Sequence, residues 1–240
     1  MNINEWEKWY TKILDDFGFS REKDEETAQI LDNILNTTNP LTIEKLQTKI
    51  HEKKAVNNYI VFGAGPSLKN SIKEIKKRRE LTENILVGAD GATTALLEEN
   101  IIPDIIVTDL DGKIDDLLIA NQKNSIFIVH AHGDNAENIT KYTPLLKNVL
   151  GTTQSTPHGN LYNFGGFTDG DRAIFLTLAL NANKITLVGM DFGEYVTKYS
   201  RPNIKKDVEP ADEIKQKKLK YAEELVEWIK ENKNVEINKI

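Results

Sequence analysis

The chain has no cysteine among its 240 residues, and this absence excludes disulfides, thiolate metal sites and cysteine nucleophiles. It also lacks an apolar run approaching the ~20 residues that a membrane span needs, and its first residues lack the basic start and apolar core of a signal peptide. An excess of positive charge is missing too, since 31 basic residues face 37 acidic ones for a net charge of −6. The sequence therefore predicts a cytoplasmic protein that binds neither a membrane nor nucleic acid, and whose phosphate sites are built locally.

The rest of the composition is that of an ordinary globular protein, with 39% hydrophobic and 28% charged residues. Residues 1–55 are predicted to be helical, because apolar side chains such as Trp6, Tyr10 and Ile13 recur at helical spacing. Across residues 56–240, short apolar runs alternate with segments of helical length. This predicts an α/β fold, in which a helical N-terminal region precedes a catalytic domain with a Rossmann-like, mostly parallel sheet and helices on both faces.

The predicted strands are short apolar runs that a parallel sheet would bury. They lie at 59–62, 85–88, 105–108, 126–130, 148–151, 185–189 and 235–237. The main predicted helices of this part lie at 67–81, 93–100, 171–180 and 211–232.

Acidic residues stand directly after two of these strands. Asp90 directly follows the run LVGA. Asp109 directly follows the run IIVT, and Asp111 comes two residues later. The carboxyl ends of parallel strands meet at one edge of a sheet, and two acids spaced by one residue share a face of an extended chain. Because clustered carboxylates repel one another unless a cation lies between them, the pattern favours a magnesium site. The alternative is that each acid caps the helix that follows it.

The segment HAHGDN follows another predicted strand and contains His130, His132 and Asp134. We predict that Asp134 is a further magnesium or water ligand. The spacing His-x-His-x-Asp also opens the signature of binuclear zinc hydrolases, but the next histidine of that signature is missing and the chain has four histidines in all. Zinc hydrolysis is therefore the less favoured alternative, and either histidine can instead be a core or hydrogen-bonding residue.

The first strand ends in the sequence GAGPSL. Gly63 and Gly65 would let the backbone pass close to a phosphate, and Ser67 can cap the helix that follows. Because Leu68 occupies the place of the third glycine, the segment is an incomplete dinucleotide-binding fingerprint. A tight strand-to-helix turn without a ligand explains it equally well.

The sequence GGFTDGDRA leads into an apolar helix. Thr168, Asp169 and Asp171 would present polar groups to a ligand, and Arg172 could clamp a phosphate. A capped helix start explains one of the two acids, although it does not explain why two glycines precede them.

The loop at 193–210 is rich in lysine and contains two prolines. Its Lys198 and Arg201 are candidate cations for a triphosphate. The loop is also our candidate for a lid over the site.

Together the segments VFGAGPSL, ADGATTALL, PDIIVTDLDG, HAHGDN, GGFTDGDRA and LVGMDFG resemble the archaeal 6-hydroxymethyl-7,8-dihydropterin pyrophosphokinase family. The resemblance extends from about Tyr59 to Gly193. The spaced acidic run is also similar to the catalytic half of thiamine pyrophosphokinases, in which a similar run binds magnesium. The resemblance implies transfer of diphosphate from Mg-ATP to the hydroxymethyl group of a reduced pterin alcohol, with AMP released, in the biosynthesis of methanopterin-type folate analogues.

The resemblance also implies roles for residues. The magnesium-binding acids would be Asp90, Asp109 and Asp111, with Asp134 a further ligand. Beside the resemblance, our own interpretation of the residues predicts that Asp109, Asp111 and Arg172 act on the reacting phosphate. The residues near nucleotide phosphate would be Gly63, Gly65 and Ser67. The residues facing the acceptor would be Thr168, Asp169 and Asp171.

Three alternatives stay open at this point. A thiamine-type pyrophosphokinase normally carries an additional β-rich domain, for which this chain has no residues to spare. A nucleotide-sugar glycosyltransferase-like domain occurs in much longer chains. A non-catalytic nucleotide-binding module would bind ATP without forming AMP. The sequence leaves open the general base, the number of metal ions and the oligomeric state, a homo-oligomer included.

Overall fold

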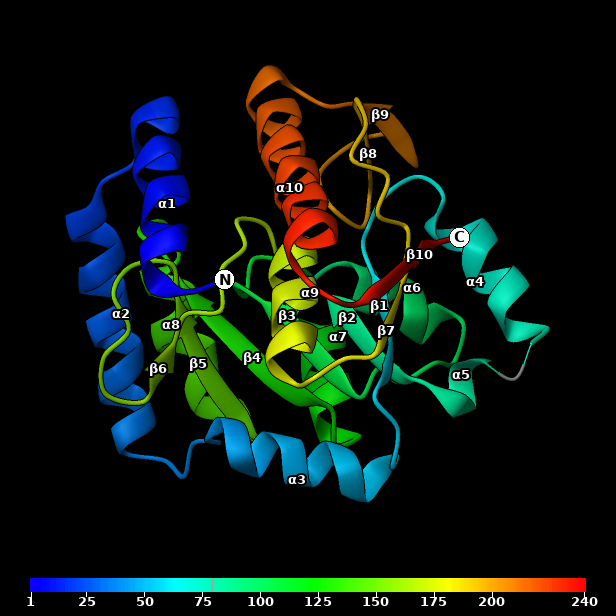
Figure 1. Cartoon of the computed structure of the whole chain (residues 1–240), viewed down its shortest axis with the longest axis horizontal. Helices are drawn as coiled ribbons and strands as arrows, with labels where there is room; N and C mark the ends of the chain where they lie inside the picture. The colour runs from blue at the N-terminus through cyan, green and yellow to red at the C-terminus, as the bar shows by residue number, and fades with distance from the viewer. Residues whose placement is uncertain (79) are drawn as a thin grey trace.

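A computed structural model describes residues 1–78 and 80–240. Its centre is an eight-stranded sheet with the order β10-β7-β1-β2-β3-β4-β5-β6, in which every neighbouring pair is parallel (Figure 1). The predicted α/β fold with a helical N-terminal region is confirmed. The strands of the sheet are β1 (Asn58–Phe62), β2 (Ile85–Ala89), β3 (Ile105–Thr108), β4 (Ile126–Ala131), β5 (Val149–Thr153), β6 (Leu161–Tyr162), β7 (Lys184–Val188) and β10 (Glu236–Lys239). A separate antiparallel hairpin consists of β8 (Tyr195–Thr197) and β9 (Val208–Pro210).

The helices cover both faces of this sheet, as a fully parallel sheet requires. They are α1 (Ile3–Phe17), α2 (Arg21–Asn36), α3 (Ile43–Lys53), α4 (Leu68–Lys76), α5 (Glu80–Glu83), α6 (Ala92–Glu98), α7 (Ile114–Gln122), α8 (Ala136–Tyr142), α9 (Asp169–Ala179) and α10 (Glu213–Asn232). None of those lying in the described part of the chain has the length and apolar character needed to span a bilayer.

Each predicted strand exists with its ends within about two residues of the prediction. The sequence missed β6, β8 and β9, which are two or three residues long, because such short segments show no periodicity. The helix predicted at 67–81 is two helices, α4 and α5. Arg79, between them, lies outside the described residues.

Alternate side chains of the strands point to opposite faces and pack on different helices. On one face the core contains Tyr10 of α1, Leu46 of α3, Phe175 of α9 and Leu225 of α10, all buried with strand residues such as Val87. The other face is covered by α2, α4, α6, α7 and α8.

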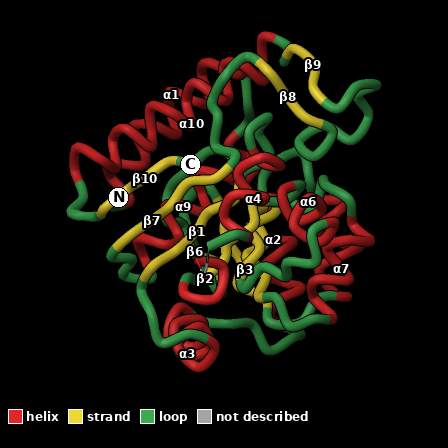
Figure 2. Tube along the Cα trace, turned by 90° about the vertical axis from the view of Figure 1, so that its right-hand side faces the viewer, coloured by secondary structure: helices red, strands yellow, loops and turns green. Residues whose placement is uncertain are grey.

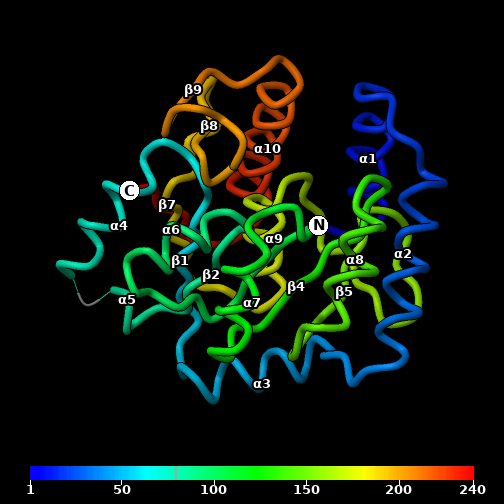
Figure 3. Tube along the Cα trace, turned by 180° about the vertical axis from the view of Figure 1, so that it is seen from behind, coloured from blue at the N-terminus to red at the C-terminus, as the bar shows by residue number. Residues whose placement is uncertain are grey.

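The N-terminal helices share these two cores with the sheet. Leu31 and Leu35 of α2 are buried with Phe127 of β4, and α2 packs against α8, which is far from it in the chain (Figure 3). At the start of α2, Ser20 accepts a hydrogen bond from the amide of Lys23 and so caps the helix. Residues 1–55 are therefore helical but do not enclose a core of their own.

The path of the chain defines where a ligand site should lie. The strands from β1 to β6 run in one direction across the sheet, and the chain then returns to place β7 on the other side of β1. Ligands of such sheets collect beyond the carboxyl ends of the strands, near this reversal. The β8–β9 hairpin lies at that end of the molecule and α3 at the opposite end (Figures 1 and 2).

Candidate functional site

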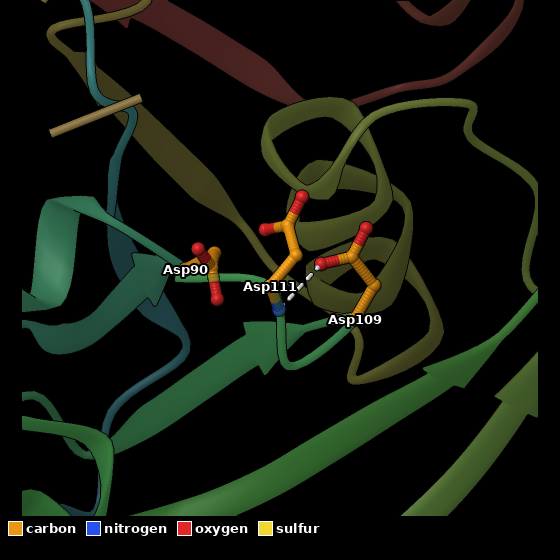
Figure 4. A group of neighbouring side chains, drawn as sticks. All are labelled: Asp90, Asp109 and Asp111. Atoms are coloured by element: carbon orange, nitrogen blue, oxygen red, sulfur yellow. Dashed lines mark hydrogen bonds between the residues drawn. The ribbon is translucent and has the colours of Figure 1, made fainter. Parts of the chain in front are cut away.

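Three carboxylates gather at the carboxyl ends of β2 and β3. One oxygen from each of Asp90, Asp109 and Asp111 lies within 4.8 Å of the others (Figure 4). Asp90 is buried, Asp109 is partly buried and Asp111 is exposed. We call these three side chains the acidic cluster.

A turn after β3 brings Asp109 and Asp111 together. Leu110 between them has a φ of 65°, a left-handed conformation that costs a leucine roughly 1–2 kcal/mol. The amide of Asp111 donates to Asp109 Oδ1 at 3.3 Å (Figure 4). The sequence placed the two acids on one face of an extended chain, but β3 ends at Thr108 and the turn brings them close.

Two contacts fasten Asp90 to the same turn. The hydroxyl of Thr108 donates to Asp90 Oδ1 and accepts from the amide of Leu110 at 2.8 Å. Gly112 passes so close that a Cβ there would lie 2.2 Å from Asp90 Oδ2. The glycine is therefore required by contact with the carboxylate.

The three acids perturb one another's titration. Burial, followed by the charges of Asp109 and Asp111, raises the pKa of Asp90 well above its ordinary value. Burial and the Asp109 charge raise the pKa of Asp111 to about 6. Burial acts in the same direction on Asp109, but the hydrogen bond and charge of His132 outweigh it and lower that pKa.

The acidic cluster fits a magnesium ion by its chemistry and its spacing. All three ligands are hard oxygens. Around magnesium, with bonds of about 2.1 Å, adjacent oxygens lie about 3 Å apart and opposite ones about 4 Å apart. Oxygens already within 4.8 Å of one another need only small rotations to reach that geometry, and a cation would relieve their repulsion.

The two histidines of HAHGDN lie outside this cluster. His132 Nε2 lies 3.1 Å from Asp109 Oδ2 and so orients a ligand of the cluster. His130 is 2% exposed, its Nδ1 lies 3.1 Å from the hydroxyl of Thr152, and burial lowers its pKa well below the ordinary value. Among residues 1–78 and 80–240, the carboxylate trio alone groups three ligands closely enough for a metal, and it includes no histidine. The zinc-hydrolase alternative therefore finds no support.

The acidic cluster opens into a cavity of about 440 Å³. All three acids of the cluster line this cavity, and so does Asp134. Asp134 is exposed and does not belong to the three-carboxylate group. The structure therefore does not place Asp134 among the three closely spaced carboxylates, as a metal ligand would require.

The glycines of GAGPSL approach another part of the chain. A Cβ at Gly65 would lie 2.6 Å from the carbonyl oxygen of Gly189. Ser67 does not cap α4 with its side chain; its amide and hydroxyl donate to Asp191 Oδ2 at 2.8 and 3.0 Å. The Asp191 carboxylate thus occupies the position beside Ser67 where the sequence predicted a phosphate. Gly63 and Gly65, by contrast, line the cavity.

The acids of GGFTDGDRA have different surroundings. Asp171 is fully buried and accepts from the amides of Phe167 and Thr168 at 2.6 and 2.8 Å, so it caps the start of α9 and does not line the cavity. Thr168 and Asp169 do line it. Burial, then the charge of Asp109, raises the pKa of Asp169 well above its ordinary value.

The glycines that precede these acids have a structural cause. Gly166 has a φ of 94°, and a Cβ there would lie 2.6 Å from the Cα of Arg172. The close contact with the start of α9 explains why this position is glycine.

Lys198 and Arg201 pair with other acids. Lys198 Nζ lies 3.1 Å from Asp207, and Arg201 pairs with Asp212. Neither residue lines the cavity. Their predicted contact with a triphosphate is therefore replaced by surface ion pairs, because the predicted loop folds into the β8–β9 hairpin and carries these side chains outward. Tyr195 of this hairpin lines the cavity instead.

Cations that the sequence did not single out line the cavity. They are Lys23 after the start of α2, and Lys215 and Lys218 on α10. The spacing of Lys215 and Lys218 places them on one helical face, but the sequence does not say that this face meets a cavity.

A buried network links the N-terminal helices to the predicted Arg172. Asp24 Oδ2 accepts from the hydroxyl of Tyr10 at 2.6 Å and from Gln154 Nε2 at 2.8 Å, and Asp24 Oδ1 accepts from the amide of Gly133 at 2.7 Å. Gln154 Oε1 in turn accepts from Arg172 Nη2 at 3.0 Å. The site is thus assembled from both parts of the chain.

A parallel α/β sheet with clustered carboxylates and a buried arginine around one cavity is typical of enzymes that transfer phosphoryl groups. The chain belongs to the 6-hydroxymethylpterin diphosphokinase MptE-like family, whose model matches residues 28–197. It is accordingly a diphosphotransferase, and the family predicted from the motifs is confirmed.

Relatives match the chain over its whole length. Proteins from Methanothermobacter thermautotrophicus and Methanocaldococcus jannaschii, each named 6-hydroxymethyl-7,8-dihydropterin pyrophosphokinase, are both 51% identical to it, over 240 and 245 residues that cover 100% of each chain. A protein of the same name from Pyrococcus furiosus is 45% identical over 240 residues, covering 99% of this chain and 98% of its own.

Among solved structures, the MAf glycosyltransferase from Magnetospirillum magneticum AMB-1 superposes with a TM-score of 0.43 and 18% identity, over 58% of this chain and 23% of that one. A similarity of this size carries no conclusion about function.

Proposed function

We propose that the protein transfers diphosphate from Mg-ATP to the hydroxymethyl group of 6-hydroxymethyl-7,8-dihydropterin and releases AMP. The observation that carries this proposal is the acidic cluster, whose oxygens lie within 4.8 Å of one another in a cavity of about 440 Å³. The names of the relatives, which are 45–51% identical over nearly the whole chain, indicate the acceptor.

In the proposed reaction the acceptor hydroxyl attacks the β-phosphorus of ATP in line. A new O–P bond forms, the bond between the α,β-bridging oxygen and the β-phosphorus breaks, AMP leaves with the electron pair, and the hydroxyl loses its proton. Asp90, Asp109 and Asp111 would hold a magnesium ion, whose positive charge would offset the negative charge that develops on the phosphate oxygens. Positioning and electrostatics supply most of the acceleration in such a transfer.

The residues of the chain have distinct parts in this proposal. The acidic cluster would hold a magnesium ion, His132 would orient Asp109 through their contact of 3.1 Å, and Arg172 would bind a phosphate oxygen. The backbone at Gly63 and Gly65 borders the nucleotide, and Thr168 and Asp169 face the acceptor. Ser67 and Asp171 do not line the cavity. They stabilise the segments that do, through hydrogen bonds to Asp191 and to the amide of Phe167.

The product would be a diphosphate ester, an activated group suited to displacement in a following condensation. We therefore place the protein in the biosynthesis of methanopterin or another folate-type pterin, in the cytoplasm. Its partners would be the small-molecule substrates, ATP and the reduced pterin alcohol.

Incubation of the protein with ATP, magnesium and the pterin alcohol, followed by chromatography of the nucleotides, tests the proposal. AMP and the pterin diphosphate should appear in equal amounts. AMP formed with thiamine but not with the pterin would contradict the proposed acceptor and support the thiamine-type alternative. ATP binding without AMP from either acceptor would indicate a non-catalytic nucleotide-binding module.

A further inference from the structure

Two lysines of α10 point to a task that the acidic cluster does not perform. Lys215 and Lys218 are three residues apart, both are partly buried, and both line the cavity. Lys217 and Lys220 of the same helix are exposed and lie outside the lining. The cavity-facing side of the helix therefore carries positive charge that is partly withdrawn from water.

Neither of these two ammonium groups has an acidic partner in the described ranges 1–78 and 80–240, where no carboxylate oxygen lies within 4.0 Å of either Nζ. By contrast, Lys217 Nζ lies 3.7 Å from Asp16. A partly buried ammonium group without a partner has lost hydration and gained no ion pair in return.

The surroundings of Lys218 show the effect of this position. Its Nζ lies 5.4 Å from the ring centroid of Phe19 and 5.7 Å from that of Phe167. Burial, followed by the charges of Lys215 and Arg172, lowers the pKa of Lys218. The positive groups on this side of the cavity thus repel one another, as the carboxylates do on the other side.

Arg172 completes the positive side. The residue is 8% exposed, and its Nη1 lies 3.4 Å from Asp169 Oδ1. Its Nε is buried and has no partner within the described residues. A guanidinium group this deeply buried normally has a close bidentate acid. Arg172 instead has one long contact with Asp169 and one hydrogen bond to the neutral Gln154, which leaves its charge only partly balanced and points to an anionic ligand.

The positive groups and the acidic cluster face the same cavity without touching. Lys215 and Arg172 line it together with Asp109 and Asp111, and within the described residues no ion pair joins either cation to these two acids. Since neither arginine nor lysine is paired with the acidic cluster, a space lies between opposite charges. A ligand with several anionic oxygens fits there, if some oxygens meet the metal and others meet the cations.

We propose that Lys215 and Lys218, with Arg172, bind the diphosphate group that is transferred, on the side of the cavity opposite the acidic cluster. This assignment rests on the proposed function, because it takes the transferred group from that reaction. It adds α10 to the binding machinery, so that the phosphates are held between a metal on the strand ends and cations on the last helix.

Isothermal titration of the protein with pyrophosphate in excess magnesium tests this assignment without turnover. We expect wild-type protein to bind, and Lys215→Met and Lys218→Met each to weaken binding about 10-fold or more, since a hydrogen bond to a charged group is lost. Lys220→Met is the matched control, and its affinity should stay within about twofold of wild type. Lys218→Arg keeps the charge and should retain most of the affinity.

A thermal melt checks that each variant is folded. A titration with magnesium alone checks that the acidic cluster is intact, because neither substitution should weaken magnesium binding. Pyrophosphate affinities of Lys215→Met and Lys218→Met equal to that of Lys220→Met would overturn the assignment. So would a wild-type protein that does not bind magnesium pyrophosphate.

The outcomes also separate this assignment from the proposed function. Lysine-dependent binding of pyrophosphate without AMP formation from the pterin would contradict the proposed function alone. AMP formation from the pterin with an unchanged rate in both lysine variants would contradict the role of α10 alone.

Discussion

Replacing Asp111 by asparagine should stabilise the metal-free protein while it abolishes most of the activity. In the folded protein, burial and the charge of Asp109 raise the pKa of Asp111 from 3.8 to about 6. The folded state then binds more protons than the unfolded state between about pH 4 and pH 6, so its stability falls as the pH rises through that window. At neutral pH the whole penalty is present.

The size of the effect follows from this shift. Taken in full, it corresponds to about 3 kcal/mol, but Asp111 is exposed and solvent screens much of the interaction, which leaves about 1 kcal/mol. For a chain of this size we expect a rise in Tm of about 2–4 °C in EDTA at pH 7.5. Most of the rise should be gone at pH 4, where the acid is protonated in the folded state and about half protonated in the unfolded state.

Magnesium should reverse the order of stability. Wild-type protein should gain Tm on addition of magnesium, and Asp111→Asn should gain little, because one of the ligands has lost its charge. Its kcat should fall on the order of 10²-fold or more, and Asp109→Asn should act alike. Asp116→Asn is the control, since Asp116 pairs with Lys113 at 3.1 Å in the first turn of α7 and does not line the cavity.

Differential scanning fluorimetry with and without EDTA, beside a coupled assay for AMP, provides both quantities. A Tm of Asp111→Asn equal to that of wild type in EDTA would refute the repulsion argument. An unaltered kcat in both Asp111→Asn and Asp109→Asn would refute the metal role.

Other substitutions test separate parts of the account. Asp24→Asn should destabilise the fold by about 2–3 kcal/mol in urea titrations, because the amide would face three donors that the buried carboxylate accepts from; a loss below about 0.5 kcal/mol would contradict the network. Gly112→Ala should displace the Asp90 carboxylate and lower magnesium affinity about 10-fold, whereas Gly193→Ala, whose Cβ would have no neighbour closer than 3.9 Å, should change little; equal affinities would contradict the packing argument. Burial holds the pKa of His130 in the folded protein well below its ordinary value. Below about pH 6.5 the unfolded state therefore binds a proton that the folded state does not, and the stability falls as the pH is lowered. His130→Asn should therefore flatten the slope of unfolding free energy between pH 6.5 and 5.5, and an unchanged slope would be evidence against it.

Sequence alone was sufficient for the parallel sheet, because buried parallel strands are uninterrupted apolar runs. The strand at 105–108 was predicted with the bounds that it has in the structure. The acidic cluster was predictable for the same reason, since acids that follow neighbouring buried strands must emerge at one edge. The turn that brings them together was not, because leucine rarely adopts the positive φ of Leu110.

Contacts between distant segments account for what the sequence missed. Asp24 bonds to Gly133, which is 109 residues away, and no local pattern connects them. The positions of Lys215 and Lys218 depend on how α10 docks beside the sheet. The glycines of GAGPSL present the opposite problem. From the sequence, a glycine that makes room for Gly189 cannot be distinguished from one that makes room for a ligand.

The central claim is that one divalent cation lies among the side chains of Asp90, Asp109 and Asp111 when nucleotide is bound. Anomalous diffraction from crystals grown with manganese and ATP measures this directly, because manganese replaces magnesium at oxygen sites and scatters anomalously. The account predicts a peak about 2.0–2.3 Å from an oxygen of each aspartate, with phosphate oxygens completing the shell. A peak elsewhere in the cavity, or three carboxylates that stay unliganded beside a bound nucleotide, would contradict it.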